Sequence, residues 1–252
     1  MSDGVETLAA AIASADRVVA LTGAGISVPS GIPDFRTPGT GLWANVDPME
    51  VAHIDAWRSD PARFWGFYSR RLASLGEVAP NDAHRALVTM QESGHLHAVV
   101  TQNVDRLHRA AGTRDPIEVH GSIATASCLA CGGRAELERV LVMIDEAEDG
   151  VPRCNCGQPL KPDVVLFGEF LPEEALERAY ALAAVADVLL CIGTSLEVYP
   201  IAQLPDITAS AGGEVALVTI GPTAWDDRAL VKLDGDVVDE LHALVDALGG
   251  AP

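Results

Sequence analysis

Residues 23–36 read Gly-Ala-Gly-Ile-Ser-Val-Pro-Ser-Gly-Ile-Pro-Asp-Phe-Arg, and an apolar run, Val18–Leu21, leads into them. Such a run is typical of a buried strand. The chain then turns through Gly23 and Gly25, where the missing side chains would let the backbone approach a phosphate. A dinucleotide-binding helix would carry a third glycine at position 28, but Val28 stands there and a proline follows it. The stretch therefore predicts a strand and a phosphate-side turn, followed by a loop that is not an ordinary Rossmann helix.

The length of the chain and its apolar content predict a globular enzyme. Its 252 residues, 48% of them hydrophobic, can bury one large core or a large core with a smaller insert. No run approaches the ~20 apolar residues of a membrane span, and the N-terminus lacks the basic start and apolar core of a signal sequence. We therefore expect a monomeric, cytoplasmic protein with no membrane partner.

The formal net charge of −19 narrows the range of partners. Direct nucleic-acid binding needs a cationic face, so this charge argues against it. A basic, lysine-bearing segment of another protein would be attracted instead. The alternative is that the charge serves solvation alone.

Short apolar strands alternate with amphipathic helices, which predicts an α/β fold with a doubly wound, Rossmann-like parallel sheet. Besides the first strand, the expected strands are 98–101, 117–119, 188–193 and 215–220, and the expected helices are 5–12, 83–91, 173–184, 201–211 and 237–248. Two segments break this alternation. Residues 37–79, with a helix over 61–75, and residues 122–160 are expected to form a smaller inserted domain. The large domain would then comprise 1–36, 80–121 and 161–252.

The cysteines predict a structural metal site. Cys128-x-x-Cys131 is followed by Cys154-x-Cys156, a spacing close to that of a zinc ribbon. Four thiolates would complete a tetrahedral Zn²⁺ and leave no position for water, so the metal would hold together the 122–160 insert. The second pair is one residue shorter than usual, and reduced thiols without metal are the alternative. Cys191 lies in an apolar strand, where core packing is expected.

Several motifs together resemble the sirtuins, the NAD-dependent protein lysine deacylases. The opening stretch, with Ser27, Asp34, Phe35 and Arg36, is similar to their cofactor signature. The other matches follow in the family's order over roughly 180 residues: Pro80-Asn81-Asp82-Ala83-His84, Thr101-Gln102-Asn103-Val104-Asp105-Arg106-Leu107-His108, Glu118-Val119-His120-Gly121, the run 162–169, and Gly193-Thr194-Ser195 with Val198 and Pro200. The resemblance implies that NAD is the co-substrate and that acyl-lysine proteins or peptides are the partners.

The resemblance also implies which residues perform the chemistry. Asn103 and Asp105 match the nicotinamide pocket, with Ile32 and Phe35 as apolar walls. His120 matches the base that takes a proton from a ribose hydroxyl, and a histidine suits this task because its ordinary pKa is ~6.5. The implied cofactor-binding positions are Gly23, Ala24, Gly25, Asp34, Phe35, Arg36, Gln102, Asn103, Asp105, Gly193, Thr194, Ser195 and Thr219. At Thr219 the family often carries asparagine, whose amide reaches further.

The remaining histidines receive no catalytic role. His84 and His108 fit helix faces and are expected to be structural, and His53, His95, His97 and His242 lie outside any motif.

Substrate recognition is implied at two further places. Val165, Phe167, Gly168 and Glu169 match the segment that binds the peptide by strand addition, with Phe167 also lining the acyl-lysine tunnel. Tyr68 and Arg71 are three residues apart on an apolar-faced helix, and this Tyr-x-x-Arg resembles sirtuins that remove succinyl and malonyl groups. Ala52 matches a small residue that widens their pocket. The alternative is a helix with a core tyrosine and solvated arginines.

We therefore expect an NAD-dependent protein lysine deacylase that removes acetyl and also succinyl or malonyl groups. It would transfer the acyl group to ADP-ribose and release nicotinamide. A protein mono-ADP-ribosyltransferase is the main alternative, although such transfer needs no base like His120. Val28 and the Asn-x-Asp motif argue against a dehydrogenase. A non-enzymatic zinc-stabilised binding module would not need Asn103, Asp105 and His120 together.

Overall fold

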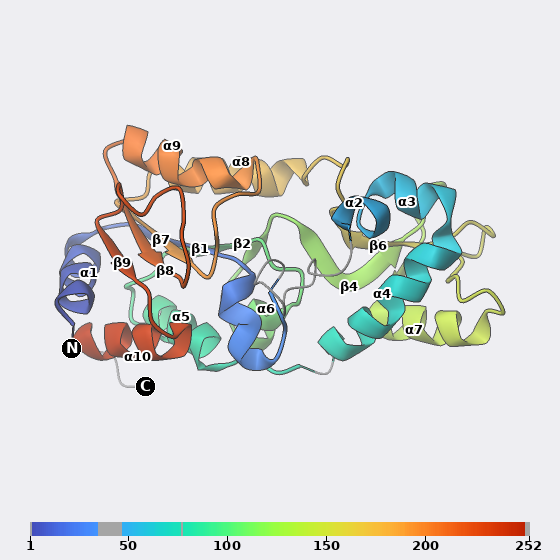
Figure 1. Ribbon diagram of the computed structural model, residues 1–252, viewed down its shortest axis with the longest axis horizontal. Coiled ribbons are helices and arrows are strands. Elements are labelled where there is room, and N and C mark those ends of the chain that lie inside the picture. The colour runs from blue at the N-terminus through green and yellow to red at the C-terminus, as the bar shows by residue number, and fades with distance from the viewer. Residues whose placement is uncertain (1, 35–46, 77, 250–252) are drawn as a thin grey trace.

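The computed structural model describes residues 2–34, 47–76 and 78–249. Phe35 and Arg36, two of the predicted cofactor-binding residues, lie outside the described residues, as do residues 37–46 and residue 77 of the first predicted insert. The molecule is elongated, with a large parallel sheet at one end and a small antiparallel sheet at the other (Figure 1).

The large sheet confirms the predicted fold class. Within the described residues it has six strands in the order β3-β2-β1-β7-β8-β9, all of them parallel. The strands are β1 (Val18–Thr22), β2 (Ala98–Thr101), β3 (Ile117–Glu118), β7 (Val188–Ile192), β8 (Glu214–Val218) and β9 (Val231–Leu233). Every residue of β1 and β7 is buried, which explains their unbroken apolar sequences. The short edge strand β9 was not predicted from the sequence.

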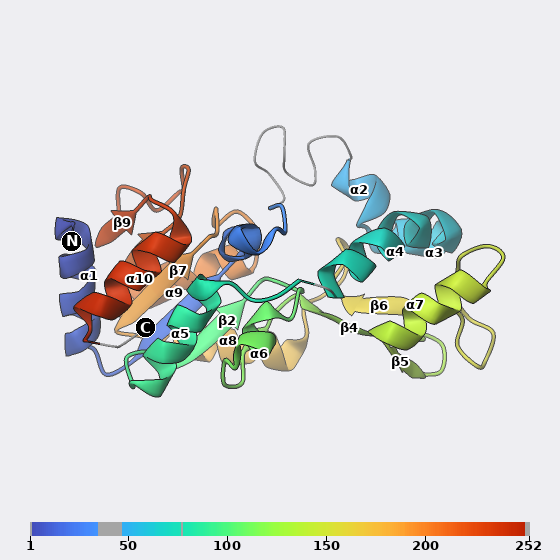
Figure 2. The same ribbon diagram turned by 90° about the horizontal axis from the view of Figure 1, so that it is seen from below.

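Helices cover both faces of this sheet (Figure 2). One face carries α1 (Asp3–Ser14), α5 (Asp82–Glu92) and α10 (Val237–Ala247), and the other carries α8 (Glu173–Ala183), the 3₁₀ turn η2 (Ile201–Gln203) and α9 (Leu204–Ser210). In α1 the apolar residues Val5, Leu8, Ala9 and Ile12 are all buried, as helical periodicity predicts. The predicted helix 201–211 is divided into η2 and α9, because Pro205 lacks the amide hydrogen that a continuous helix would need there.

The small sheet is antiparallel and has the order β5-β4-β6 within the described residues. Its strands are β4 (Gly121–Ser127), β5 (Arg134–Glu136) and β6 (Lys161–Val164), and a separate apolar core joins them to α3 (Ile54–Ser59), α4 (Pro61–Gly76) and α7 (Leu137–Glu146). The short helix α2 (Pro48–Val51) precedes α3.

Two features of this small unit differ from the sequence-based expectation. The sequence assigned no helix to residues 122–160, which break the alternation of helices and strands, yet α7 spans ten residues and buries Leu137 and Val140. In addition, β6 lies in the span grouped with the large domain, but it pairs with β4. Antiparallel pairing depends on contacts between distant segments, which a short apolar strand does not reveal by itself.

None of the described helices is both long enough and apolar enough to span a bilayer.

Candidate active site

The candidate site lies where β1, β2 and β7 end at the carboxyl edge of the large sheet. β1 pairs with β2 on one side and with β7 on the other, so the chain leaves the sheet toward opposite faces at this point. Such a switch point is where open parallel sheets bind ligands. Three segments meet there: the 3₁₀ helix η1 (Ala24–Ser30), the loop after β2, and the loop that begins at Gly193.

Gly23 and Gly25 let the first of these loops touch the third. The Gly25 amide donates to the Gly193 carbonyl over 2.8 Å. A Cβ on Gly25 would lie 2.6 Å from Gly193 Cα, and a Cβ on Gly23 would lie 2.8 Å from Gly193 O. Both contacts are too close for any side chain. The glycines are therefore required for the packing of the two loops, a reason that the sequence alone did not supply.

Asn103, Asp105 and Ser27 form one buried polar cluster. The Ser27 hydroxyl donates to Asp105 Oδ2 over 2.7 Å, and Asn103 Nδ2 donates to Ser27 Oγ and to the Gly23 carbonyl, each over 3.1 Å. These bonds fix the amide so that its nitrogen faces the protein, which leaves Asn103 Oδ1 to accept from a ligand. The cluster is well suited to an amide such as that of nicotinamide.

The Asp105 carboxylate lies in an environment that opposes its charge. Burial raises its pKa, while the bonds from the Leu107 amide and the Ser27 hydroxyl act in the opposite direction. A carboxylate that is poorly solvated and held in place is a favourable neighbour for positive charge that develops on a bound ligand.

Two buried histidines support this cluster from behind. His108 Nε2 lies 2.8 Å from Thr22 Oγ1, His84 Nε2 lies 3.5 Å from Ser27 Oγ, and the two ring centroids are 5.0 Å apart. Their structural role was predicted from the sequence, but their link to the pocket through Ser27 and Thr22 was not.

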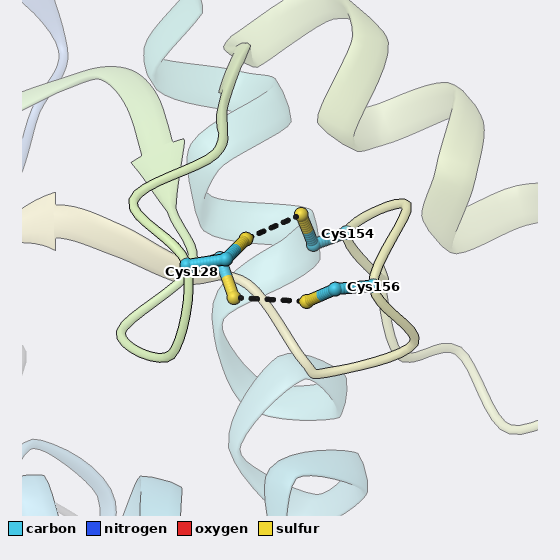
Figure 3. A group of neighbouring side chains, drawn as sticks. Cys128, Cys154 and Cys156 are labelled. Atoms are coloured by element: carbon cyan, nitrogen blue, oxygen red, sulfur yellow. Dashed lines mark hydrogen bonds between the residues drawn. The ribbon is translucent and has the colours of Figure 1, made fainter.

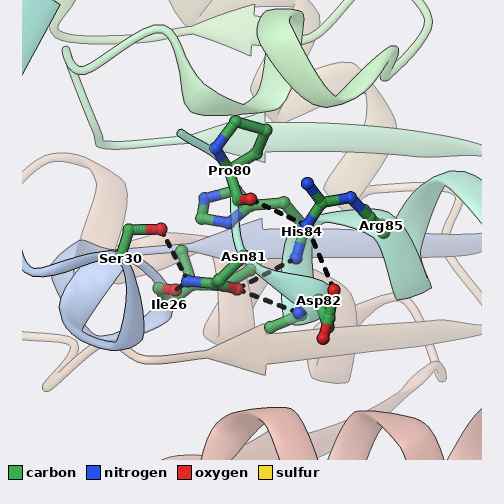
Figure 4. A network of polar contacts seen from close by, with 8 residues as sticks. Ile26, Ser30, Pro80, Asn81, Asp82, His84 and Arg85 are labelled. Carbon is green, nitrogen blue, oxygen red and sulfur yellow. Dashed lines mark hydrogen bonds and ion pairs between the residues drawn. The ribbon is translucent and has the colours of Figure 1, made fainter. Parts of the chain in front are cut away.

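Asn81 explains how the Pro-Asn-Asp-Ala-His motif places His84. Its side-chain oxygen accepts from the Ala83 and His84 amides at the start of α5, while its nitrogen donates to the Ile26 carbonyl and to Ser30 Oγ (Figure 4). One side chain thereby ties α5 to η1, so the position of His84 relative to Ser27 is fixed.

His120 lies between β3 and β4, where the chain passes from the large sheet to the small one. Its Nδ1 lies 3.0 Å from the Gln102 carbonyl, which can only accept, so Nδ1 carries the hydrogen and Nε2 keeps its lone pair. Burial lowers the pKa of His120, and the bond to Gln102 opposes that shift. The imidazole is therefore a neutral proton acceptor near pH 7.

The loop that begins at Gly193 presents hydroxyl groups to the same site. Gln102 Nε2 donates to Thr194 Oγ1 over 2.9 Å, so two predicted cofactor-binding residues are already in contact. Ser195 donates to Glu197. Thr219 is buried; its amide donates to the Leu233 carbonyl over 3.0 Å, and its hydroxyl lies 3.5 Å from the carbonyl of its neighbour Ile220. Asp34 is the last described residue before position 47.

The segment predicted to bind the peptide, residues 165–169, is held by backbone hydrogen bonds to the chain around residues 52–54. The Phe167 amide donates to the Ala52 carbonyl, and the Phe167 carbonyl accepts from the Ile54 amide, both over 2.9 Å. Phe167 therefore cannot offer its amide to a substrate strand, whereas Gly168 is exposed. Ala52, predicted as a pocket residue, is brought next to this segment.

Two residues in this region were missed by sequence analysis. A Cβ on Gly168, whose φ is 84°, would lie 2.6 Å from His53 Nε2, so His53 packs directly under the segment. Lys161 is buried and its ammonium lies 2.9 Å from Glu169 Oε2, which also accepts from the Leu166 amide. Glu169 therefore links the end of the segment back to Lys161 and Leu166. Neither contact leaves a local sequence signal.

The four predicted cysteines come together at the far end of the small sheet. Cys128 Sγ lies 3.5 Å from Cys156 Sγ, Cys131 Sγ lies 3.4 Å from Cys154 Sγ, and all four sulfurs lie within 4.8 Å of one another (Figure 3). A tetrahedral Zn²⁺ with Zn–S bonds of about 2.3 Å separates its sulfurs by about 3.8 Å. The one-residue spacing of the second pair is therefore compatible with a structural zinc.

The comparisons with known proteins agree with this geometry. Residues 23–200 match the model of the Sir2 family. The chain belongs to the Sir2 family. It is 43% identical over 250 residues to NAD-dependent protein deacetylase 1 of Pyrobaculum aerophilum, covering 99% of this chain and 96% of that protein. It is 44% identical over 237 residues to the NAD-dependent protein deacylase of Thermococcus kodakarensis, covering 91% of each.

The fold is shared with a solved Sir2 structure. That structure, Sir2 with a deacetylated p53 peptide and 3′-O-acetyl ADP-ribose, superposes with a TM-score of 0.94 at 36% identity, covering 98% of this chain and 99% of the other. Membership of the Sir2 family makes NAD the co-substrate and assigns the four cysteines to a structural zinc, which their geometry fits.

Proposed function

We propose that this NAD-dependent protein deacylase accepts acyl-lysine side chains whose acyl group ends in a carboxylate, such as succinyl and malonyl, as well as acetyl. The observation that supports the proposal is the pairing of Tyr68 and Arg71 on α4. Arg71 is half-buried, and its guanidinium lies 4.7 Å from the centroid of the Phe67 ring. A carboxylate brought into a poorly hydrated tunnel needs such a partner.

Partial burial affects the ionisation of both members of the pair. Burial raises the pKa of Tyr68 to about 12, although the nearby Arg71 charge opposes the shift. Burial lowers the pKa of Arg71, and Tyr68 opposes that shift in turn. The Tyr68 ring stacks on Phe64 with centroids 4.4 Å apart. The hydroxyl therefore remains a neutral donor, and the half-buried guanidinium beside it carries the charge that a bound carboxylate would neutralise.

The position of the pair also suits an acyl pocket. Tyr68 packs against the core of the small unit together with Val104, which lies between Asn103 and Asp105. The same core includes Leu166 of the predicted peptide segment. Ala52, which presents only a methyl group, accepts a backbone bond from Phe167 of that segment.

The residues of the active site support acyl transfer. When bound, NAD supplies a ribose from which nicotinamide can leave and to which the acyl group passes. In our proposal Asn103 Oδ1 accepts from the nicotinamide amide, and Asp105 provides negative charge where positive charge develops. His120 Nε2 takes the proton of a ribose hydroxyl. A mono-ADP-ribosyltransferase would not need this last step, and the curated relatives named above are a deacetylase and a deacylase.

The test is the activity of Arg71→Met on matched succinyl- and acetyl-lysine peptides. Methionine keeps the apolar bulk of the stem and removes the charge. We expect kcat/KM for desuccinylation to fall by about 30- to 1000-fold, the equivalent of about 2–4 kcal/mol for a lost charge-assisted bond. Deacetylation should change little, because an acetyl group ends in a methyl.

Two further variants sharpen this test. Tyr68→Phe should act in the same direction but more weakly, because it removes a single neutral donor. Arg70→Met is the matched control, since position 70 is about 100° away around the helix. If Arg71→Met lowers both activities equally, Arg71 has only a structural role and the acidic-acyl proposal is wrong.

A further inference from the structure

A polar groove of about 670 Å³ runs beside the predicted peptide segment. Its floor comes from the small sheet, with Ser122 and Thr125 of β4 and Asp163 of β6. One wall contains Val165 and Glu169 of the peptide segment, followed by Phe170 and Pro172, and Arg106 and Arg109 rim the groove. The groove does not include Asn103, Asp105 or His120, so it is a separate site next to the one where the acyl-lysine would bind.

Nearly every cation of the groove is neutralised by a groove carboxylate. Arg109 lies 2.9 Å from Glu118, Arg134 lies 3.1 Å from Asp163, and Lys161 lies 2.9 Å from Glu169. The Arg106 side chain makes no ion pair and no hydrogen bond with any residue that the structure describes. Among the groove carboxylates, Glu136 is likewise left without an ion pair to a described residue.

The backbone at Arg106 is strained, so folding does not explain why this position carries a long side chain. Its φ of 69° and ψ of 5° lie in the left-handed region. Glycine adopts this conformation freely, whereas other residues do so at a cost. The fold alone therefore favours glycine at position 106. The Arg106 side chain presents a charge to the groove without forming an ion pair or a hydrogen bond to any described residue.

Phe170 adds an apolar surface at the same groove. Its side chain is 97% exposed, so almost none of the ring is covered by the protein itself. Aromatic and arginine side chains that become covered on binding contribute most of the affinity at many interfaces. A segment that entered the groove from the peptide site would meet both Phe170 and Arg106.

We propose that this groove binds an acidic side chain of the substrate protein, close in sequence to the acyl-lysine. Arg106 pairs with the carboxylate, and Phe170 covers the adjoining part of the chain. The inference rests on the proposed function, because the groove shares Val165 and Glu169 with the predicted peptide segment. The occupant follows from charge complementarity with Arg106. It is a local preference, opposite in sign to the attraction of basic segments that the net charge of −19 would produce.

The test is a panel of fluorescent acyl-lysine peptides with alanine, glutamate or arginine at each of the four positions on either side of the lysine. Binding is measured by anisotropy, and turnover separately, in 50 mM and 500 mM NaCl. We expect glutamate at one or more positions to improve Kd and kcat/KM by about three- to tenfold at low salt, and much less at high salt. Arg106→Gly should remove the preference without lowering the melting temperature, because glycine relieves the backbone.

Arg109→Gln is the matched control. Because Glu118 already neutralises Arg109, removing the Arg109 charge should leave the preference for glutamate unchanged. The proposal is overturned if wild type shows no glutamate preference, if Arg106→Gly retains it, or if arginine is preferred and Glu136→Gln abolishes that preference. A failure of the proposed function would look different. Succinyl-lysine peptides would then not be turned over, or Arg71→Met would lower desuccinylation and deacetylation equally, while the acetyl-lysine peptides of the panel would still show whether Arg106 selects glutamate.

Discussion

The buried pair of His84 and His108 predicts that the protein loses stability steeply in mild acid. Neither side chain has more than 3% of its surface exposed, and the Nδ1 atoms of both lack a hydrogen-bond partner among the described residues. Burial lowers the pKa of His84 to about 4, with the Arg85 charge acting in the same direction. Burial also lowers the pKa of His108 to about 3, and His84 contributes to that shift.

The size of the effect follows from linkage. An unfolded histidine has a pKa of ~6.5, so below that pH the unfolded state binds protons that the folded state rejects. Each of these two histidines then reduces the free energy of unfolding by about 1.4 kcal/mol per pH unit. At pH 5 the pair together removes about 4 kcal/mol relative to pH 8, a large part of the 5–15 kcal/mol typical of a domain. The lowered pKa of His120 acts in the same direction, and the raised pKa of Asp105 opposes it.

The assay is urea unfolding at pH 8, 6.5 and 5 with constant ionic strength, on wild type, His84→Gln and His108→Gln. A glutamine amide can still donate to Ser27 or Thr22 but does not titrate. Each variant should therefore lose about 2 kcal/mol less than wild type between pH 8 and pH 5. His97→Gln is the matched control, because His97 is exposed before β2 and outside the pair. The reasoning is refuted if wild type loses less than about 1 kcal/mol over this range, or if both variants lose as much as wild type.

Two further predictions concern the metal and the base. Metal analysis should find about one zinc per chain, and a chelator or Cys128→Ser should lower the melting temperature and activity together. A stable, fully active, zinc-free protein would contradict a structural zinc. His120→Ala should reduce deacylation by about 10²–10⁴-fold while nicotinamide exchange falls less, because nicotinamide leaves before the base acts. Asn103→Ala should impair exchange itself. The acidic limb of wild-type kcat/KM should lie below pH 6.5, because burial lowers the pKa of His120 and the imidazole loses its acceptor lone pair only below that pKa. Normal deacylation by His120→Ala would assign the base to another residue.

The location of the site could be predicted because its residues come directly after the ends of strands. Gly23, Asn103 and Thr194 come within two residues of the carboxyl ends of β1, β2 and β7, and parallel strands place those ends along one edge. The apolar runs that mark the strands are visible in the sequence, so the polar residues after them could be assigned to one site. The four cysteines could be predicted for a similar reason, since their short spacings are themselves the signal for a metal knuckle.

What the sequence did not show are contacts between segments that carry no local pattern. Gly25 meets Gly193, His53 lies under Gly168, and Lys161 closes on Glu169. Residue spacing cannot predict these contacts, because each depends on how two distant segments approach each other. The helix α7 was missed for another reason: only Leu137 and Val140 are buried along it, and so short an apolar stripe is weak evidence among the cysteine turns.

The sequence by itself therefore determined the class of fold, the place of the site on the sheet and the identity of the residues beside it, because strand period and turn residues are local properties. The tertiary structure alone decided how the side chains of those residues are oriented. Ser27 orients the amide of Asn103 and the carboxylate of Asp105, and the Gln102 carbonyl leaves His120 Nε2 free to accept a proton. These are directional hydrogen bonds between segments 18 to 78 positions apart, and their geometry exists only once the sheet has brought the segments together.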